Sequence, residues 1–165
     1  MADTEEFDTF YRHTCQRLFT MVYALTGDIG EAQDVTQEAY ARAWQRWGML
    51  ARYTDAEGWV RTVARRIAIS RWRRARNALT AHRRSAPREP IPGPDPDVVA
   101  LVAALSRLPV PTRTAIVLHH LADLSVAEVA RETSVPVGTV KARLARGRRA
   151  LATLLTSDDT EDIHV

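Results

Sequence analysis

The 165-residue chain contains a single cysteine, and this shortage is the first guide to its class. Cys15 has no partner for an internal disulfide, and together with His13 it makes too few ligands for a metal site. No apolar run is long enough to span a membrane, so we expect no membrane insertion. The acidic N-terminus lacks the positive charge and apolar stretch of a secretory signal, which predicts a cytoplasmic protein.

The sequence also lacks the short motifs of common enzymes. It has no glycine-rich phosphate loop, no nucleophile elbow and no cysteine cluster. His119 and His120 are adjacent, so on a helix their side chains point about 100 degrees apart and do not chelate a metal as an i, i+4 pair would. Most carboxylates lie in acidic tails or at positions typical of helix surfaces. We therefore expect no enzymatic activity, no metal and no cofactor.

The net charge of +3 conceals an uneven distribution along the chain. Residues 1–58 carry 5 basic and 10 acidic side chains, whereas residues 59–88 carry 10 arginines and no acid. Residues 137–156 carry 5 further cations without an acid, and residues 157–165 are acidic. Solvated helix faces usually mix both signs, so two purely cationic blocks predict two contact surfaces for a polyanion.

A proline-rich segment divides the chain, with five of the eight prolines between Ala86 and Pro96. Proline removes a backbone donor and restricts the preceding residue, so neither helix nor sheet can run through this segment. Neither side of it shows strand-like alternation. The sequence thus predicts an all-α fold of two small helical domains joined by a proline-rich linker. We expect the first domain at 1–78, the linker at 79–97, the second domain at 98–156 and a tail at 157–165.

Apolar residues recur at helical spacing three times in the first domain. They predict helices from Phe7 to Leu25, from Ala32 to Trp47 and from Trp59 to Arg76, with a loop at residues 51–58 before the third. The third helix carries seven of the twelve arginines of this domain. Aromatic residues at helical spacing are more often core than ligand-binding, which is how we interpret Tyr40, Trp44, Trp47 and Trp59. Trp72 stays open to core packing or to stacking on an unpaired base.

The second domain carries the sharpest local pattern. Ser125 and Glu128 have the spacing of a capping box, a turn follows through Ser134, and Pro136 is placed to open the next helix. Two short helices joined by a tight turn, the second basic and free of acid, are typical of a helix-turn-helix whose second helix enters a major groove. The alternative is a helical hairpin whose charged face meets only solvent.

Three stretches resemble one protein family. Gly27–Trp44 resembles region 2 of the extracytoplasmic-function sigma factors, the group 4 members of the sigma-70 family, which direct bacterial RNA polymerase to promoters. Trp59–Arg74 is similar to the promoter-melting helix of that family, and Val135–Arg148 is similar to its region 4 recognition helix. The resemblance is to the SigE-like actinobacterial subfamily and covers about residues 5–78 and 98–155. Two separate motifs in the family's order make it specific.

The resemblance implies three contact surfaces. The second helix matches the face that docks on the clamp helices of the largest polymerase subunit: Asp34, Gln37, Glu38 and Arg42. The third helix matches the element that binds the minus-ten region and a flipped base of the melted strand: Arg61, Arg65, Arg66, Ser70, Arg73 and Arg74. The last helix matches the reader of the minus-thirty-five duplex: Thr139, Lys141, Ala142, Arg143, Arg146 and Arg149.

The implied function is promoter-specific transcription initiation without a cofactor. Core RNA polymerase and promoter DNA are the implied partners, and the family makes an anti-sigma factor a candidate third partner. Two alternatives remain at this point. A stand-alone helix-turn-helix regulator would bind duplex DNA without polymerase, and an interaction adaptor would bind only protein.

The chain departs from the family pattern at three places. Arg66 stands where the family commonly has an asparagine near the captured base, and Ser70 replaces a frequent aspartate. Thr133 and Ser134 replace the usual leucine and glycine of the turn. A left-handed conformation at Ser134 would cost about 1 kcal/mol relative to glycine, which weakens the domain without forbidding the fold.

Overall fold

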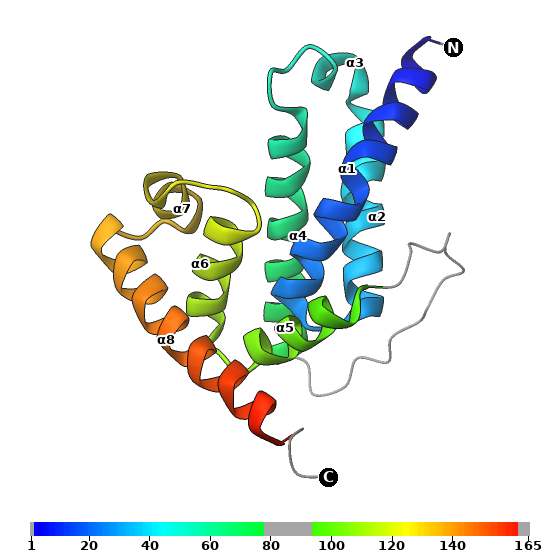
Figure 1. The fold of residues 1–165 in the computed structure, drawn as a ribbon. Coiled ribbons are helices and arrows are strands. Elements are labelled where there is room, and N and C mark those ends of the chain that lie inside the picture. The colour runs from blue at the N-terminus through cyan, green and yellow to red at the C-terminus, as the bar shows by residue number, and fades with distance from the viewer. Residues whose placement is uncertain (1, 78–93, 162–165) are drawn as a thin grey trace. The chain divides into compact units, whose positions relative to one another are not determined.

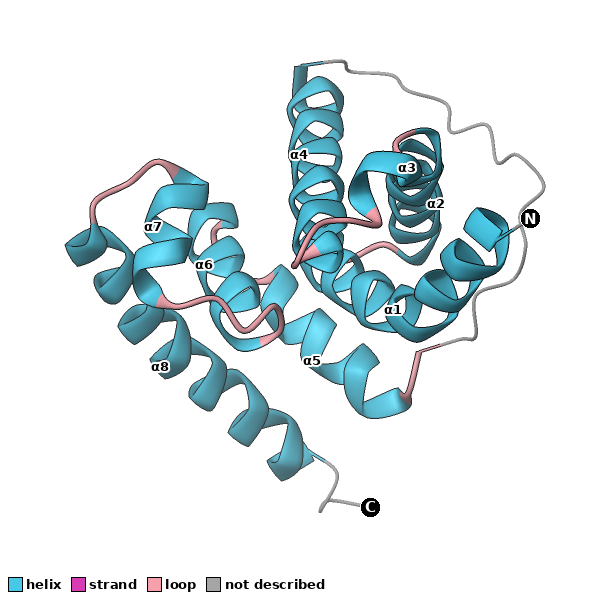
Figure 2. Cartoon of the chain, turned by 90° about the horizontal axis from the view of Figure 1, so that it is seen from above, coloured by secondary structure: helices cyan, strands magenta, loops and turns pink. Residues whose placement is uncertain are grey.

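The computed structural model describes residues 2–77 and 94–161, and the chain divides into two compact units, 1–93 and 94–165 (Figure 1). The described residues form helices joined by short loops, with no strand among them (Figure 2). The first unit holds α1 (Ala2–Thr26), α2 (Ile29–Gln45), α3 (Trp47–Leu50) and α4 (Ala56–Asn77). The second holds α5 (Pro96–Ser106), α6 (Val110–His120), α7 (Val126–Thr133) and α8 (Val137–Glu161).

The predicted all-α architecture is confirmed, with two differences at the edges of the domains. Most of the expected linker, residues 78–93, lies outside the described residues. Asp95 caps α5 by accepting from the backbone N–H of Asp97 at 2.9 Å, so the last linker positions already belong to a helix. At the other end α8 continues to Glu161, so the expected tail begins as helix. Within the described ranges no helix is both long and apolar enough to cross a membrane.

The break between α1 and α2 follows from two residues. Gly27 has a φ of 71°, a left-handed conformation that glycine adopts without steric cost, and its N–H bonds the carbonyl of Tyr23 at 2.8 Å. Asp28 then caps α2, because its carboxylate accepts from the N–H of Glu31 at 2.8 Å. The chain therefore reverses within two residues, and α2 packs along α1.

The core of the first unit lies between α1, α2 and α4, which pack against one another in all three pairs. Small residues on α2 permit close approach, because Ala32, Ala39 and Ala43 are completely buried. Larger side chains from the other elements fill the remaining space and are at most 1% exposed: Phe19, Val22, Leu50 and Val60. Across the solvent-facing edge, Arg17 of α1 pairs with both carboxylate oxygens of Glu57 at 2.9 and 3.1 Å.

The aromatic residues near the end of α2 divide between core and surface. Tyr40 and Trp47 are 4% and 5% exposed, which confirms their predicted core role. Trp44 was expected in the core as well, and that expectation is wrong, because it is 45% exposed. Its ring contacts Phe7 at a centroid distance of 5.1 Å. Phe7 lies near the start of α1, and only a short stretch of helix precedes it. This stretch does not cover the other side of the Trp44 indole, which is therefore exposed to solvent.

The boundaries of α2 and α4 differ slightly from the sequence prediction. Arg46 adopts φ −116° and ψ 14°, which ends α2 before Trp47, and the single turn α3 then directs Trp47 and Leu50 inward. The third predicted helix begins three residues early, at Ala56. Asp55 provides the start, because its carboxylate accepts from the N–H of Gly58 at 2.8 Å.

The second unit confirms the helix-turn-helix. Both reciprocal bonds of the capping box are present: the Ser125 hydroxyl accepts from the N–H of Glu128 at 3.1 Å, and the Glu128 carboxylate accepts from the N–H of Ser125 at 2.7 Å. Ser134 is left-handed at φ 56°, as the turn requires. Pro136 precedes the first residue of α8 rather than lying within it, and its carbonyl accepts from Thr139 and Val140.

Some apolar residues of the second unit lie outside its core. Val140 and Leu144 of α8 are buried, and this helix packs against α6 and α7. The apolar side chains of Leu121, Val137 and Leu155 are instead 37%, 42% and 39% exposed. Each lies at or near the end of its helix, where fewer neighbouring elements are available to cover a side chain.

Candidate nucleic-acid interfaces

The exposed face of α4 is strongly cationic. Arg66, Arg73 and Arg74 are exposed, and none of their neighbours on the helix from Trp59 onward is an acid. Ser70 lies on the same surface and accepts a hydrogen bond from Nη2 of Arg74 at 3.1 Å. This face can contact phosphates through its guanidinium groups, and such contacts are strongly salt-dependent.

The predicted minus-ten residues do not all share this exposure. Arg65 is only 7% exposed, and Arg61 is half-buried. Both lie on the side of α4 that carries Ala68, which is 5% exposed, because positions i, i+4 and i+7 share one helix face. The six predicted residues therefore separate into four exposed side chains and two that line the inner edge of the helix.

The predicted docking residues on α2 form a second surface of the first unit. Asp34, Gln37 and Glu38 are half-buried, and Arg42 is exposed. Arg42 donates to Oε1 of Glu38 at 2.6 Å, one helical turn away. The structure thus brings Glu38 and Arg42 into direct contact and places Asp34 one turn before them on the same face.

Arg71 connects these two surfaces, and the sequence reasoning did not single it out. Its guanidinium, carried by α4, pairs with Glu38 and lies 3.6 Å from a carboxylate oxygen of Glu31 and 3.9 Å from one of Asp34. Glu31, Asp34 and Glu38 follow one another at i, i+3 and i+7 on α2. That spacing places three acids on one face, which is a signal that a cation lies opposite them.

The turn between α2 and α4 exposes further aromatic and apolar surface. A shallow hollow is lined by Gln45, Arg46, Gly48 and Met49. The guanidinium carbon of Arg46 lies 5.9 Å from the centre of the Trp59 ring, within cation–π range, and Trp59 is half-buried.

Trp72, which the sequence left open to core packing or to stacking on an unpaired base, is 40% exposed on α4.

In the second unit, α8 separates its packing face from its polar face. Val140, Leu144 and Gly147 are buried, and α6 is the main neighbour of this helix. Among the predicted minus-thirty-five residues, Thr139 and Arg143 are half-buried, and four are exposed: Lys141, Ala142, Arg146 and Arg149. An exposed helix with this composition can place side chains in a major groove.

The two adjacent histidines contact neighbouring elements of the helix-turn-helix. His119 Nδ1 lies 2.7 Å from the carbonyl oxygen of Leu124, which ties α6 to the loop before α7. Arg148 of α8 donates through Nε to Nε2 of His120 at 3.3 Å. Burial, followed by the charges of His119 and Arg148, lowers the pKa of His120. Among the described residues no group of three metal-ligating side chains occurs.

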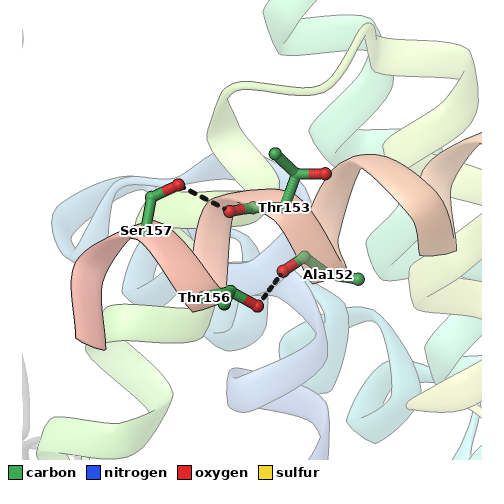
Figure 3. Close-up of a pocket in the computed structure, with 4 residues that line it drawn as sticks. All are labelled: Ala152, Thr153, Thr156 and Ser157. Carbon is green, nitrogen blue, oxygen red and sulfur yellow. Dashed lines mark hydrogen bonds between the residues drawn. The ribbon is translucent and has the colours of Figure 1, made fainter. Parts of the chain in front are cut away.

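A second shallow hollow lies on the C-terminal half of α8 (Figure 3). Its hydroxyl groups turn onto their own helix: Thr156 donates to the carbonyl of Ala152 at 2.6 Å, and Ser157 donates to that of Thr153 at 2.8 Å. Hydroxyl hydrogens used in this way are not available to a ligand. This hollow therefore offers little to a polar molecule.

Two protein-family models match the chain, one in each unit. Residues 10–78 match Sigma-70 region 2, and residues 99–151 match Sigma-70, region 4. The first match covers α2 and α4 with their acidic and cationic faces, and the second covers the helix-turn-helix. A stand-alone DNA-binding regulator would account only for the second match.

Curated relatives align with this chain across both units. SigE of Mycolicibacterium smegmatis, an ECF RNA polymerase sigma factor, is 29% identical over 97% of this chain, which spans 65% of that relative. SigC of Mycobacterium tuberculosis is 30% identical over 92% of the chain and 84% of the relative. Among solved structures, the sigma factor RpoE of Bartonella quintana, in complex with the anti-sigma factor NepR, matches with a TM-score of 0.71 at 22% identity. That match covers 93% of this chain and 99% of RpoE.

Proposed function

Since the chain belongs to the ECF RNA polymerase sigma factors, we propose that it binds core RNA polymerase and directs transcription initiation at specific promoters. One observation carries this proposal: a region 2 unit and a region 4 unit follow each other in one chain. An interaction adaptor would require neither an exposed arginine-rich helix nor a capped helix-turn-helix.

We assign polymerase docking to the polar face of α2. Asp34, Gln37, Glu38 and Arg42 supply both charges and hydrogen-bonding groups on one helix, which suits a polar, helical partner surface. Electrostatic complementarity of this kind sets specificity and the association rate more than it sets affinity.

Promoter recognition is divided between the two units. In the first, the exposed residues Arg66, Ser70, Arg73 and Arg74 of α4 contact the melted minus-ten strand, while Arg61 and Arg65 shape the inner edge of that surface. In the second, α8 enters the major groove at the minus-thirty-five element, with Lys141, Arg143 and Arg146 near base edges and phosphates. Duplex readout needs a helix that fits a groove, whereas unpaired bases need a cationic track beside exposed rings.

The chain contributes to initiation by binding and not by catalysis, and it acts in the cytoplasm, where polymerase and the chromosome are found. An anti-sigma factor is a further proposed partner. Support comes from the similar fold of RpoE, which was solved together with such a protein.

In vitro transcription tests the proposal. Purified chain and core polymerase from the same bacterium are incubated with a library of genomic promoter fragments, and the transcripts are sequenced. We expect defined start sites that depend on the chain. Absence of chain-dependent transcription from every fragment would contradict the proposal. A gel shift on an active promoter, with and without core polymerase, separates a sigma factor from a stand-alone regulator, which would bind without the polymerase.

A further inference from the structure

We propose that Arg71 regulates the docking face on α2: in the free protein it covers the carboxylates that polymerase uses, and docking releases it toward promoter DNA. This inference rests on the proposed function, because it assumes that α2 binds polymerase and α4 binds DNA. It adds a connection between the two surfaces.

The first step of the argument is the geometry of Arg71. Its guanidinium pairs with Glu38 and has Glu31 and Asp34 at 3.6 and 3.9 Å. Asp34 and Glu38 are two of the four residues assigned to docking. A basic side chain from polymerase that approaches either carboxylate therefore meets Arg71 already in place.

The second step is the strength of these contacts. The side chains of Arg71, Asp34 and Glu38 are each about one-third exposed, at 32%, 32% and 34%. Ion pairs at such positions are screened by water and salt and are individually weak. Glu38 also accepts from Arg42 at 2.6 Å, so it keeps a cationic partner when Arg71 leaves. A cation of the polymerase can therefore displace the Arg71 guanidinium from these carboxylates at little cost in free energy.

The third step is the position of Arg71 on α4. It follows Ser70 directly and precedes Arg73 and Arg74, which are exposed on the proposed minus-ten surface. A released guanidinium at this point adds one more cation to a helix that already has no acid after Glu57. When polymerase pairs with the carboxylates of α2, Arg71 is released and α4 attracts phosphate more strongly. In the free protein Arg71 stays paired, so non-specific DNA binding is weaker.

The variant Arg71→Gln separates this role from a structural one. Because the carboxylates of α2 are uncovered, we expect its affinity for core polymerase to rise about threefold to tenfold, measured by anisotropy of N-terminally labelled full-length chain. In the holoenzyme we expect the variant to bind a fluorescent non-template oligonucleotide from an active promoter more weakly. The slope of its log binding constant against log salt concentration should be smaller by about one. Without polymerase, the variant should bind this oligonucleotide as tightly as the wild-type chain does, because Arg71 of the free wild-type chain is paired with the carboxylates of α2.

Controls make each outcome decisive. Arg12→Gln removes the same charge from an exposed position on α1 and should leave core affinity unchanged. Arg71→Lys keeps the cation without the planar guanidinium, so it should raise the affinity for core polymerase by less than Arg71→Gln does. If Arg71→Gln does not fold, the affinity of Arg71→Lys tests the inference in its place. Unchanged or lower core affinity in a folded Arg71 variant overturns the inference. Failure of the wild-type chain to bind core polymerase would instead overturn the proposed function, and this inference with it.

Discussion

Gly147 of α8 lies directly against Ile116 of α6. A Cβ atom at position 147 would stand 2.8 Å from Cγ1 of Ile116 and 3.0 Å from Cγ2 of Thr112. Both neighbours are buried, so the two helices approach each other closely at a point where α8 has no side chain.

Gly147→Ala should therefore destabilise the second unit by about 1 kcal/mol or more, because overpacking outweighs the better helix propensity of alanine. Slower hydrogen exchange in the amides of α6 and α8 would contradict this expectation. Gly138→Ala is the matched control, since a Cβ there meets nothing within 4 Å and the change should be neutral or stabilising. Tryptophan fluorescence should report no change, because all four tryptophans lie in the first unit.

Ser134→Gly should stabilise the helix-turn-helix by about 0.5 to 1 kcal/mol. Ser134 is left-handed at φ 56°, and glycine adopts this conformation without the Cβ clash, although its greater freedom in the unfolded chain offsets part of the gain. Amide exchange of α7 and α8 measures the effect. Asp123, at φ 54°, provides the comparison: aspartate tolerates this region better than serine, so Asp123→Gly should gain less.

Tyr40→Phe should destabilise the first unit by about 1 kcal/mol. The Thr14 hydroxyl donates to the carbonyl of Phe10 at 2.8 Å, so the Tyr40 hydroxyl donates to Thr14 across a buried 2.6 Å contact. Burial raises the pKa of Tyr40, so this donor keeps its proton. Urea unfolding followed by tryptophan fluorescence measures the loss. Tyr53→Phe, at an exposed position, should change stability by less than about 0.5 kcal/mol.

Stability of the second unit should depend on pH through His120. Its pKa is lowered in the folded state, so the unfolded chain binds more protons as the pH falls through the ordinary histidine value of 6.5. Stability should accordingly be constant above about pH 7 and decrease below it, as Arg148 loses its acceptor. His120→Gln should flatten amide-exchange protection of α6 and α8 between about pH 7 and pH 5. His13→Gln, on α1, should leave that profile unchanged.

Arg146→Ala should weaken use of the minus-thirty-five element by about 1 to 3 kcal/mol if the side chain reads a base, with relaxed preference at one position. Holoenzyme affinity for a promoter series with single substitutions measures this. Arg107→Ala, which removes an exposed cation at the end of α5, should have no effect on that preference. A uniform loss across all promoter variants would instead assign Arg146 to a phosphate.

Local chemistry in the sequence was sufficient to predict most of the fold. The capping box at Ser125 and Glu128, the left-handed Ser134 and the alanine-rich face of α2 all depend on residues close together in the chain. Trp44 could not be placed in this way, because its exposure depends on where the start of α1 lies in space relative to α2. The extent of α8 was also missed, since an acidic composition suggested a tail although its residues are compatible with helix.

The candidate sites were predictable to a similar degree. Residue type and spacing predicted α4 and α8 as contact surfaces, and the family resemblance added α2. Neither separated the exposed Arg66 from the buried Arg65, which are neighbours in the chain. The link from Arg71 to three acids joins elements more than thirty residues apart. Such a contact requires the packing of α2 on α4, which a linear pattern does not contain.

The continuity of α8 has an electrostatic consequence. All the cations of this helix lie in its first half, between Lys141 and Arg149, so they repel one another and lie nearer the positive end of the macrodipole. The first half of the helix is therefore destabilised by its own side chains. A phosphate backbone beside the first half would neutralise that strain, and part of the free energy of binding would then appear as increased helix stability.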